Sequence, residues 1–202
     1  MTQLFAVIRH GPTEWNETGR IQGRTDIPLS DQGRKIIQKQ TLPSEFSKAN
    51  WLTSPLIRAK ETAQLLGIEN ANVDDRLIET NWGDWEGQTL AYLRTKYGKE
   101  MLINESKGLD LLPPNGESPR QVADRLSSLL SEIGSGRKGK MVAAITHKGV
   151  IRSLLALSTR WDMLGKAPIK LDWRAAHIFS IDNNGIAKPH RVNVTLKEKG
   201  CL

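Results

Sequence analysis

The sequence predicts a three-layer α/β/α sandwich built around a mostly parallel sheet. Two short apolar runs, residues 4–8 and 141–146, are rich in Val, Ile and Ala and are typical of strands buried on both faces. Segments with helical spacing alternate with strand-like segments along the rest of the chain, as in α/β folds. The 202 residues contain no internal repeat or linker and are 38% hydrophobic. We therefore expect a single domain over residues 1–202 with a substantial core.

The first half of the chain carries clear helix boundaries. Ser30 precedes a polar, Gly-containing stretch that opens a helix. Pro55 ends an apolar run, and Gly67 is placed to end the helix that follows it. The elements expected here are a strand at 4–8, a helix near 34–40, a buried strand at 50–54, a helix at about 56–66, and a weak strand or extended loop at 73–79.

The second half contains the clearest helix start of the sequence. Ser118 can cap a helix, Pro119 suits its first position, and Gln121 completes a capping box. Residues 182–185, Asp-Asn-Asn-Gly, are typical of a hairpin turn. The elements expected are a helix at 88–97, a Pro-containing loop at 107–115, a helix from 118 to about 133, a strand at 141–146, a helix at about 149–157, and strands at 176–181 and 187–196.

The charge balance is basic, with 29 Lys and Arg against 22 Asp and Glu and a net charge of +7. The basic residues are spread along the chain, with mild concentration at 166–174 and 188–199 and no continuous basic run. A nucleic-acid-binding protein would show a basic patch with aromatic residues between the charges. We expect no nucleic-acid partner and a positive field that steers small phosphorylated molecules to the protein.

Cysteine content and apolar run lengths indicate the compartment. The single cysteine, Cys201, excludes an internal disulfide framework or a thiol cluster for metal. The N-terminus has no charged leader before its short apolar run, and no later run approaches a membrane-spanning length. These features predict a cytoplasmic protein without a membrane partner; they do not indicate an oligomeric state.

Each of the two apolar runs ends in a histidine. His10 follows the first run and His147 follows the second. In a parallel sheet the carboxyl ends of strands meet at one edge, where ligands bind. Two imidazoles at that edge, with Arg9 beside one of them, predict a cationic pocket suited to a phosphoryl group.

Phosphoryl transfer without a metal needs a nucleophile, positive charge to hold the phosphoryl oxygens, and an acid for the leaving group. His10 is the candidate nucleophile, since nearby cations would keep its imidazole neutral. Arg58 lies in the first turn of the helix that follows a buried strand, and its planar guanidinium can bind two phosphate oxygens. No set of His and carboxylates has metal-ligand spacing, so neither a metal nor another cofactor is expected.

Four motifs in order along the chain resemble those of the histidine phosphatase superfamily, in the branch that contains cofactor-dependent phosphoglycerate mutases and small-molecule phosphatases. An Arg-His-Gly triplet alone would be a weak signal, but four motifs at family-like spacing are a specific one. The resemblance covers nearly the whole chain and implies a phosphoglycerate-mutase-like fold. The motifs are Arg9-His10-Gly11 with Asn16, residues 54–63, residues 77–79 through 82–87, and residues 146–149.

The resemblance implies a role for each motif. His10 becomes transiently phosphorylated and Glu79 acts as the general acid, then activates the water that hydrolyses phosphohistidine. Burial of Glu79 beside a Trp-rich loop would favour its protonated form. The phosphoryl oxygens are bound by Arg9, Arg58 and His147, with a possible hydrogen bond from Asn16.

Three further residues are candidates for substrate contact. Gln22 falls where relatives often contact substrate. Lys148 stands where many relatives carry glycine, and its side chain either adds charge at the pocket rim or points to water. Trp82, like Trp15 and Trp85, either lines an apolar leaving-group pocket or packs a loop onto the core.

The expected function is that of a metal-independent phosphomonoesterase acting on a small phosphorylated metabolite through phospho-His10. Mutases of this family carry paired arginines in the segment over the pocket. Residues 88–117 are short and contain Arg94, Lys96, Lys99 and Lys107 but no such pair of arginines. A cofactor-dependent phosphoglycerate mutase is the alternative. A non-catalytic relative that binds a phosphorylated ligand is the second alternative, although the full set of site residues is present.

Overall fold

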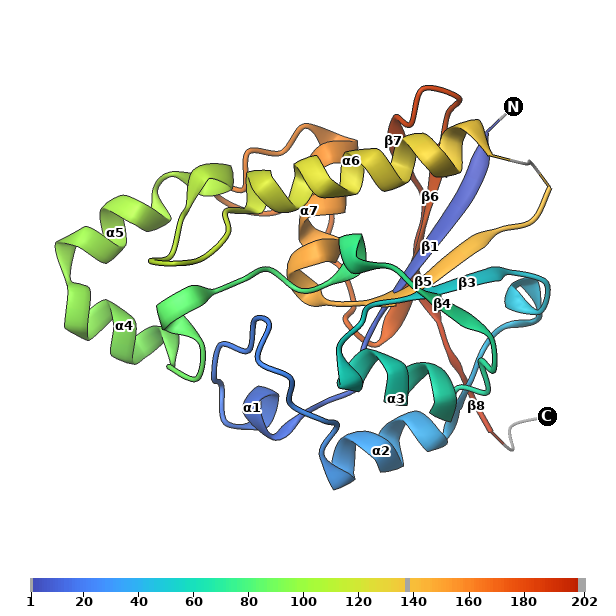
Figure 1. Cartoon of the computed structure of the whole chain (residues 1–202), viewed down its shortest axis with the longest axis horizontal. Coiled ribbons are helices and arrows are strands. Elements are labelled where there is room, and N and C mark those ends of the chain that lie inside the picture. The colour runs from blue at the N-terminus through green and yellow to red at the C-terminus, as the bar shows by residue number, and fades with distance from the viewer. Residues whose placement is uncertain (1, 137–138, 200–202) are drawn as a thin grey trace.

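The computed structural model describes residues 2–136 and 139–199, and Figure 1 shows their arrangement. Six strands form the main sheet in the order β4-β3-β5-β1-β6-β7. The pairs β4–β3, β3–β5 and β5–β1 are parallel, whereas β6 pairs antiparallel with β1 and β7 with β6. The mostly parallel sheet is therefore confirmed. The strands are β1 Gln3–Arg9, β3 Asn50–Thr53, β4 Ala71–Val73, β5 Val142–Thr146, β6 Ala175–Ile181 and β7 Ala187–Thr195.

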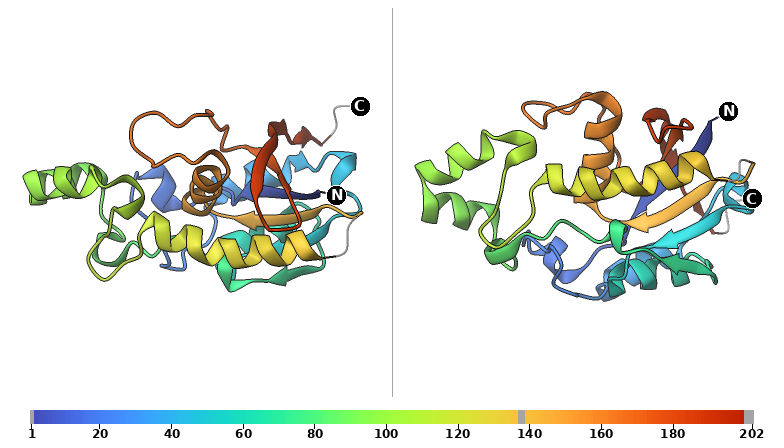
Figure 2. Two further views of the ribbon diagram at one scale, coloured as in Figure 1. Left: turned by 90° about the horizontal axis from the view of Figure 1, so that it is seen from above. Right: turned by 45° about the horizontal axis from the view of Figure 1, so that its top comes forward.

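Helices cover both faces of this sheet (Figure 2). On β1, Phe5 and Val7 point to the layer of α6 and α7, while Ala6 and Ile8 point to the layer of α2 and α3. This alternation follows from the period of two residues in a strand. Because both faces are covered, the central strands β1 and β5 are apolar at residues 4–8 and 142–145. The helices are α2 Asp31–Gln38, α3 Ile57–Leu65, α6 Pro119–Ser135 and α7 Lys148–Thr159.

A helical segment projects beyond the sandwich at the left of Figure 1. We call residues 81–117 the α4–α5 extension; it has its own apolar cluster of Trp85, Leu93 and Met101. Its elements are η3 Gly83–Trp85, α4 Leu90–Tyr97, α5 Lys99–Glu105 and η4 Gly108–Asp110. The remaining short elements are α1 Glu14–Glu17, η1 Ser44–Phe46, η2 Asp75–Leu77, and a two-stranded sheet of β2 Gln40–Thr41 with β8 Lys197–Glu198.

The predicted elements are present, with differences at several boundaries. Helix α6 starts as predicted, because the Ser118 hydroxyl and the Gln121 side chain form a capping box. Strand β4 lies at residues 71–73 and overlaps the predicted segment 73–79 only at Val73. The strand ends there because Asp74 accepts a hydrogen bond from the Arg76 N–H and turns the chain into η2. Helix α5 was not expected; Gly98, at φ +51°, makes the sharp turn that separates it from α4.

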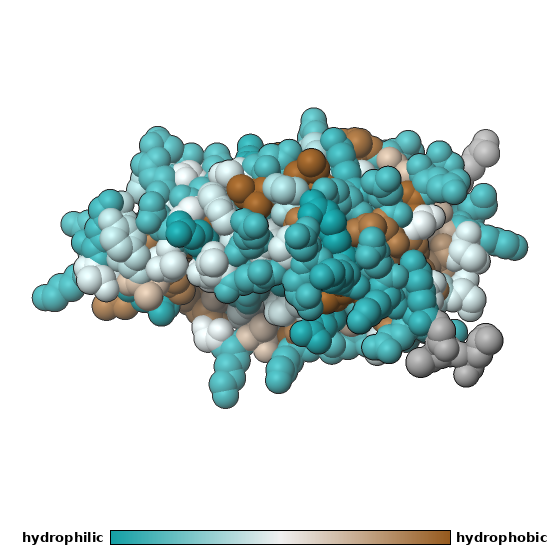
Figure 3. Space-filling model, turned by 90° about the horizontal axis from the view of Figure 1, so that it is seen from below, coloured by the Kyte–Doolittle hydropathy of each residue, from teal (hydrophilic) through white to brown (hydrophobic). Residues whose placement is uncertain are grey.

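The outer face of α2 is polar. Figure 3 views the molecule from below, the side on which α2 lies in Figure 1, and shows a surface covered mainly by hydrophilic residues. In α2, Gly33 and Ile37 are buried while Arg34 is half-buried and Gln32 is exposed. Among the helices of the described chain, none is both long enough and apolar enough to cross a membrane.

His177 on β6 gives the fold a dependence on pH. The side chain is 0% exposed and its Nδ1 accepts a hydrogen bond from the Asn193 N–H at 3.2 Å. Burial lowers the pKa of His177 from 6.5 to about 4, partly offset by Asp172. Because the folded-state pKa lies below the unfolded one, the contribution to stability is complete above pH 6.5 and is lost as the pH falls toward 4.

We expect the His177→Gln variant to lose part of this acid sensitivity. In the parent, protonation in the unfolded chain should reduce the free energy of unfolding by up to about 3 kcal/mol between pH 6.5 and 4. Urea unfolding at a series of pH values measures this. The matched control is His190→Gln at an exposed position. A His177→Gln protein with the parent's full pH dependence would contradict the assignment.

Candidate active site

The carboxyl ends of β1, β3 and β5 bring the predicted residues together. His10 follows β1 and donates a hydrogen bond from Nδ1 to the Gly11 carbonyl at 2.7 Å. A carbonyl oxygen can only accept, so this bond assigns the ring hydrogen to Nδ1 and leaves Nε2 with its lone pair. Burial, with Arg9 and Arg58 nearby, lowers the pKa of His10 well below 6.5. The imidazole is therefore a neutral base and a potential nucleophile.

His147 follows β5 and lies against His10, with ring centroids 5.0 Å apart. Its Nε2 is 2.7 Å from Ser54 Oγ, which also accepts a hydrogen bond from the Leu56 N–H. The serine hydroxyl can thus donate to Nε2, which leaves the ring hydrogen on Nδ1. That Nδ1 is buried and without a hydrogen-bonding partner in the described chain. Such a donor beside His10 can bind an anionic oxygen.

Arg9 and Arg58 bring two guanidinium groups to the same edge. Arg58 is 0% exposed, and its terminal nitrogens donate to the carbonyls of Thr25 at 2.9 Å and Gly23 at 2.6 Å. Within residues 2–136 and 139–199, the Nε atoms of both Arg9 and Arg58 are buried without a partner. Burial lowers the pKa of each guanidinium, and Glu79 partly offsets this. Desolvated, unpaired N–H groups of this kind are strong donors to phosphate.

Glu79 lies at the end of the segment that follows η2 and is 8% exposed. Its carboxylate accepts hydrogen bonds from the Thr80 N–H at 2.8 Å and from the Gly149 N–H at 3.2 Å. A Cβ on Gly149 would lie 2.4 Å from Glu79 Oε1, so a larger residue there would displace the carboxylate. The first turn of α7 therefore fixes both His147 and Glu79.

Asn16 and Gln22 form a small network beside the site. Asn16 Oδ1 accepts from the Thr13 N–H at 3.2 Å, and its Nδ2 donates to Gln22 Oε1 at 3.4 Å. The Thr13 hydroxyl also donates to Gln22 Oε1 at 3.2 Å. Gln22 Nε2 is buried without a partner among the described residues, so Gln22 is held as a hydrogen-bond donor. Asn16 is used mainly to orient Gln22, although it also lines the cavity described below.

The tryptophans of the third motif pack in the α4–α5 extension. The rings of Trp82 and Trp85 stack with centroids 6.1 Å apart, and Trp85 is 3% exposed. A Cβ added to Gly87 would lie 3.2 Å from the Trp15 ring, so Trp15 packs close to this glycine. Of the two roles considered for Trp82, its stacking on Trp85 fits the packing of a loop better than the lining of a leaving-group pocket. Lys148 is exposed and lies over a different ring, that of Trp173.

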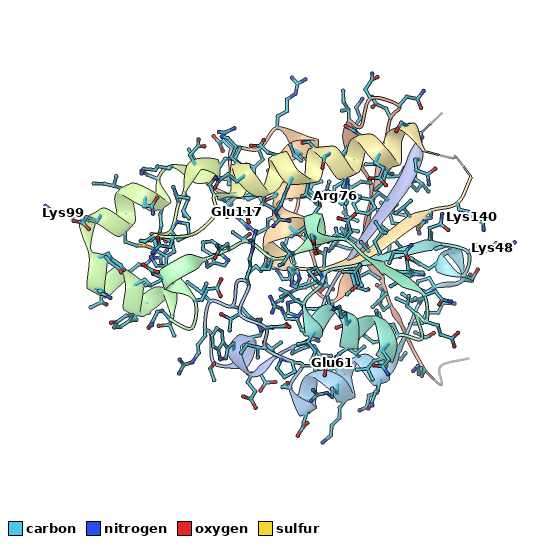
Figure 4. All side chains as sticks on the ribbon, viewed as in Figure 1. Lys48, Glu61, Arg76, Lys99, Glu117 and Lys140 are labelled. Carbon is cyan, nitrogen blue, oxygen red and sulfur yellow. The ribbon has the colours of Figure 1, made fainter. Side chains whose placement is uncertain are left out.

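Sequence patterns did not indicate the residues that hold these groups in place. The Glu86 carboxylate accepts hydrogen bonds from the N–H groups of Arg24 and Thr25 at 2.8 Å and from Trp82 N–H at 3.1 Å. It thereby fixes the loop whose carbonyls bind Arg58. Arg125 on α6 donates to the carbonyls on either side of Leu77 and pairs with Glu117, which is labelled in Figure 4. A carboxylate that accepts hydrogen bonds from several N–H groups cannot be recognised from a sequence pattern, although Glu86 lies within the third motif.

A cavity of about 300 Å³ opens beside His10, toward α2 and Gln40 of β2. Its walls combine polar and apolar groups, as a binding site for an organic molecule requires. No three His, Cys, Asp or Glu side chains in the described chain are grouped as a metal site would require. The cavity is lined mainly by Ile8, Arg9, His10, Asn16, Ile36, Ile37, Trp173 and Arg174.

The sequence model of the histidine phosphatase superfamily (branch 1) matches residues 5–194. The chain belongs to this family. It is 36% identical over 159 residues to phosphoglycerate mutase-like protein 4 of Arabidopsis thaliana, covering 74% of this chain and 68% of that protein. It is 33% identical over 178 residues to glucosyl-3-phosphoglycerate phosphatase of Mycolicibacterium vanbaalenii, covering 80% and 78%.

The structure agrees with the family assignment. It resembles a mycobacterial glucosyl-3-phosphoglycerate phosphatase solved in complex with VO3, with a TM-score of 0.75 and 26% identity over 96% of this chain and 100% of that one. Curated members of the family similar to this chain include both phosphatases and phosphoglycerate mutases. Membership therefore establishes a phosphoryl-transfer family and does not by itself separate hydrolysis from mutase activity.

Proposed function

We propose that this histidine phosphatase hydrolyses small phosphomonoesters without a metal, through a phosphohistidine on His10. The observation that carries the proposal is the Nδ1 hydrogen bond of His10 to Gly11, which leaves Nε2 unprotonated near the guanidinium groups of Arg9 and Arg58. Arg9, Arg58 and His147 each have a buried N–H group that has no partner among the described residues and can bind the phosphoryl oxygens. Gln22 adds a fourth donor beside them, oriented by Asn16.

The reaction proceeds in two displacements. His10 Nε2 attacks phosphorus, the bond from phosphorus to the ester oxygen breaks, and protonated Glu79 gives its proton to that oxygen. The Glu79 carboxylate then takes a proton from water, whose oxygen attacks phosphorus. The P–N bond breaks and its electron pair returns to Nε2, so that inorganic phosphate leaves and the enzyme is regenerated. The buried N–H donors stabilise the charge on the phosphoryl oxygens in both steps.

The α4–α5 extension favours a phosphatase over a mutase. A mutase must retain a phosphorylated intermediate, which needs additional cations over the site. Arg94 is instead paired with Glu105, with Nη2 2.8 Å from Oε1, and Lys96 lies over the rings of Tyr92 and Tyr97. Two of the four basic residues of the extension, Arg94 and Lys96, are thus engaged within it.

The test is hydrolysis of p-nitrophenyl phosphate from pH 5 to 8 in the presence of EDTA. We expect turnover that survives the chelator and, in a separate assay without EDTA, inhibition by vanadate. A parallel assay of phosphoglycerate mutase activity, with and without a bisphosphoglycerate primer, should show much slower transfer than hydrolysis. Mutase activity without hydrolysis would support the alternative function. Vanadate binding without turnover on any phosphomonoester would support the non-catalytic alternative.

A further inference from the structure

Lys148 is a cation at the site that the proposed chemistry does not use. It directly follows His147 as the first residue of α7, and its Nζ lies 5.3 Å from the centre of the Trp173 ring. None of the ion pairs between described residues involves Lys148. The aromatic ring thus holds the ammonium group without neutralising its charge.

The ring under Lys148 belongs to the wall of the cavity beside His10. Trp173 lines this cavity together with Arg9, His10 and Arg174. A substrate whose phosphoryl group lies at His10 and whose remainder extends into the cavity therefore passes Trp173. A cation placed on the same ring is within reach of a polar group on that part of the substrate.

The surroundings of Lys148 carry an excess of positive charge. Arg152, one turn further along α7, lies over the ring of Trp161 at 4.9 Å and takes part in no ion pair among the described residues. Partial burial, Arg9 and Arg152 lower the pKa of Lys148, while Glu79 opposes them. An anion bound at Lys148 would reduce the repulsion among these cations. This anion would be a second one, separate from the phosphoryl group at His10.

We propose that Lys148, held on Trp173, binds a second anionic group of the substrate. The preferred substrates are then phosphomonoesters that also carry a carboxylate or a second phosphoryl group. This inference rests on the proposed function for its substrate, and it makes Lys148 a specificity-determining residue. The ammonium group offers three N–H donors, and a hydrogen bond to a charged partner is worth about 10-fold to 100-fold in affinity.

Matched substrates test the proposal by turnover. Phosphoserine and phosphoethanolamine differ in one carboxylate, and fructose 1,6-bisphosphate and fructose 6-phosphate differ in one phosphoryl group. We expect the parent to prefer the member with the extra anion by about 10-fold or more in kcat/KM. The Lys148→Gln variant should lose this preference, while its hydrolysis of phenyl phosphate stays within about 3-fold of the parent. Which pair responds identifies carboxylate or phosphoryl as the second group.

Lys48→Gln is the matched control for the loss of one positive charge. Lys48 is exposed just before β3, at the end of the molecule where Figure 4 labels it, opposite the α4–α5 extension. This variant should retain the parent's preference for the additional anion. A preference that falls equally in both variants would reflect the overall field of the protein and would overturn the assignment to Lys148.

A binding measurement separates this inference from the proposed function. Phosphonoacetate and methylphosphonate cannot be hydrolysed and differ in one carboxylate, and methylenediphosphonate supplies a second phosphoryl group. Calorimetry should show that the parent binds phosphonoacetate, methylenediphosphonate or both more tightly than methylphosphonate. Lys148→Gln should show no such difference. The inference is wrong if Lys148→Gln alters kcat/KM for all substrates and the affinity for all phosphonates by the same factor, or alters none of them. The proposed function still stands in that case, provided that the parent hydrolyses phenyl phosphate.

Discussion

Replacement of His10 by alanine is expected to abolish phosphatase turnover, with a loss on the order of 10⁴–10⁶-fold in kcat, as for other enzyme nucleophiles. The reason is that the second histidine at this edge cannot take over, because His147 Nε2 is engaged by Ser54 at 2.7 Å. Steady-state hydrolysis of p-nitrophenyl phosphate measures the loss.

The His10→Asn variant separates loss of chemistry from loss of structure. The asparagine amide can still donate to the Gly11 carbonyl, as His10 Nδ1 does at 2.7 Å. We therefore expect it to fold with a melting temperature close to the parent's and to be as inactive as His10→Ala. Ordinary turnover in either variant would exclude His10 as the nucleophile.

The Glu79→Gln variant is expected to lose about 10²–10⁴ in rate, with the larger loss on substrates whose leaving group is a poor one. An alkoxide needs a proton as the ester bond breaks, whereas p-nitrophenolate departs without one. The glutamine can still accept a hydrogen bond from the N–H of Thr80 or Gly149, so the local structure should persist. A series of aryl and alkyl phosphates, compared by kcat/KM, measures the dependence.

The same variant should separate the two steps of the reaction. With p-nitrophenyl phosphate, loss of the base slows hydrolysis of phosphohistidine more than its formation. Stopped-flow absorbance should show a burst of p-nitrophenol close to one equivalent of enzyme, followed by slow turnover. An equal loss of rate on all leaving groups and no burst would argue that Glu79 only shapes the site.

The sequence predicted the positions of both histidines because the information is local. A short apolar run ending in a polar residue identifies a strand end, and parallel pairing of β1 with β5 brings two such ends together. The anchoring of Arg58 was not predictable in this way, because it depends on the carbonyls of Gly23 and Thr25, more than 30 residues earlier in the chain. The loop that supplies them is fixed in turn by Glu86.

Helix α5 and the cavity beside His10 show a second limit of sequence analysis. The segment around α5 has only one fully buried apolar side chain, Met101, and exposes Leu102 and Ile103, so its hydrophobic pattern does not indicate a helix. The cavity combines β1, α2 and the loop with Trp173. These segments meet only through the tertiary fold, and no single stretch of sequence records their contact.

The most direct test of the central claim is the identification of the phosphorylated residue. Glu79→Gln would be mixed with p-nitrophenyl phosphate, quenched within the burst in alkali, and analysed by peptide mass spectrometry. The account predicts one acid-labile, alkali-stable phosphoryl group on the peptide containing His10, and none in the double variant that also carries His10→Ala. Burst product without a phosphorylated His10, or a phosphoryl group on another side chain, would contradict it.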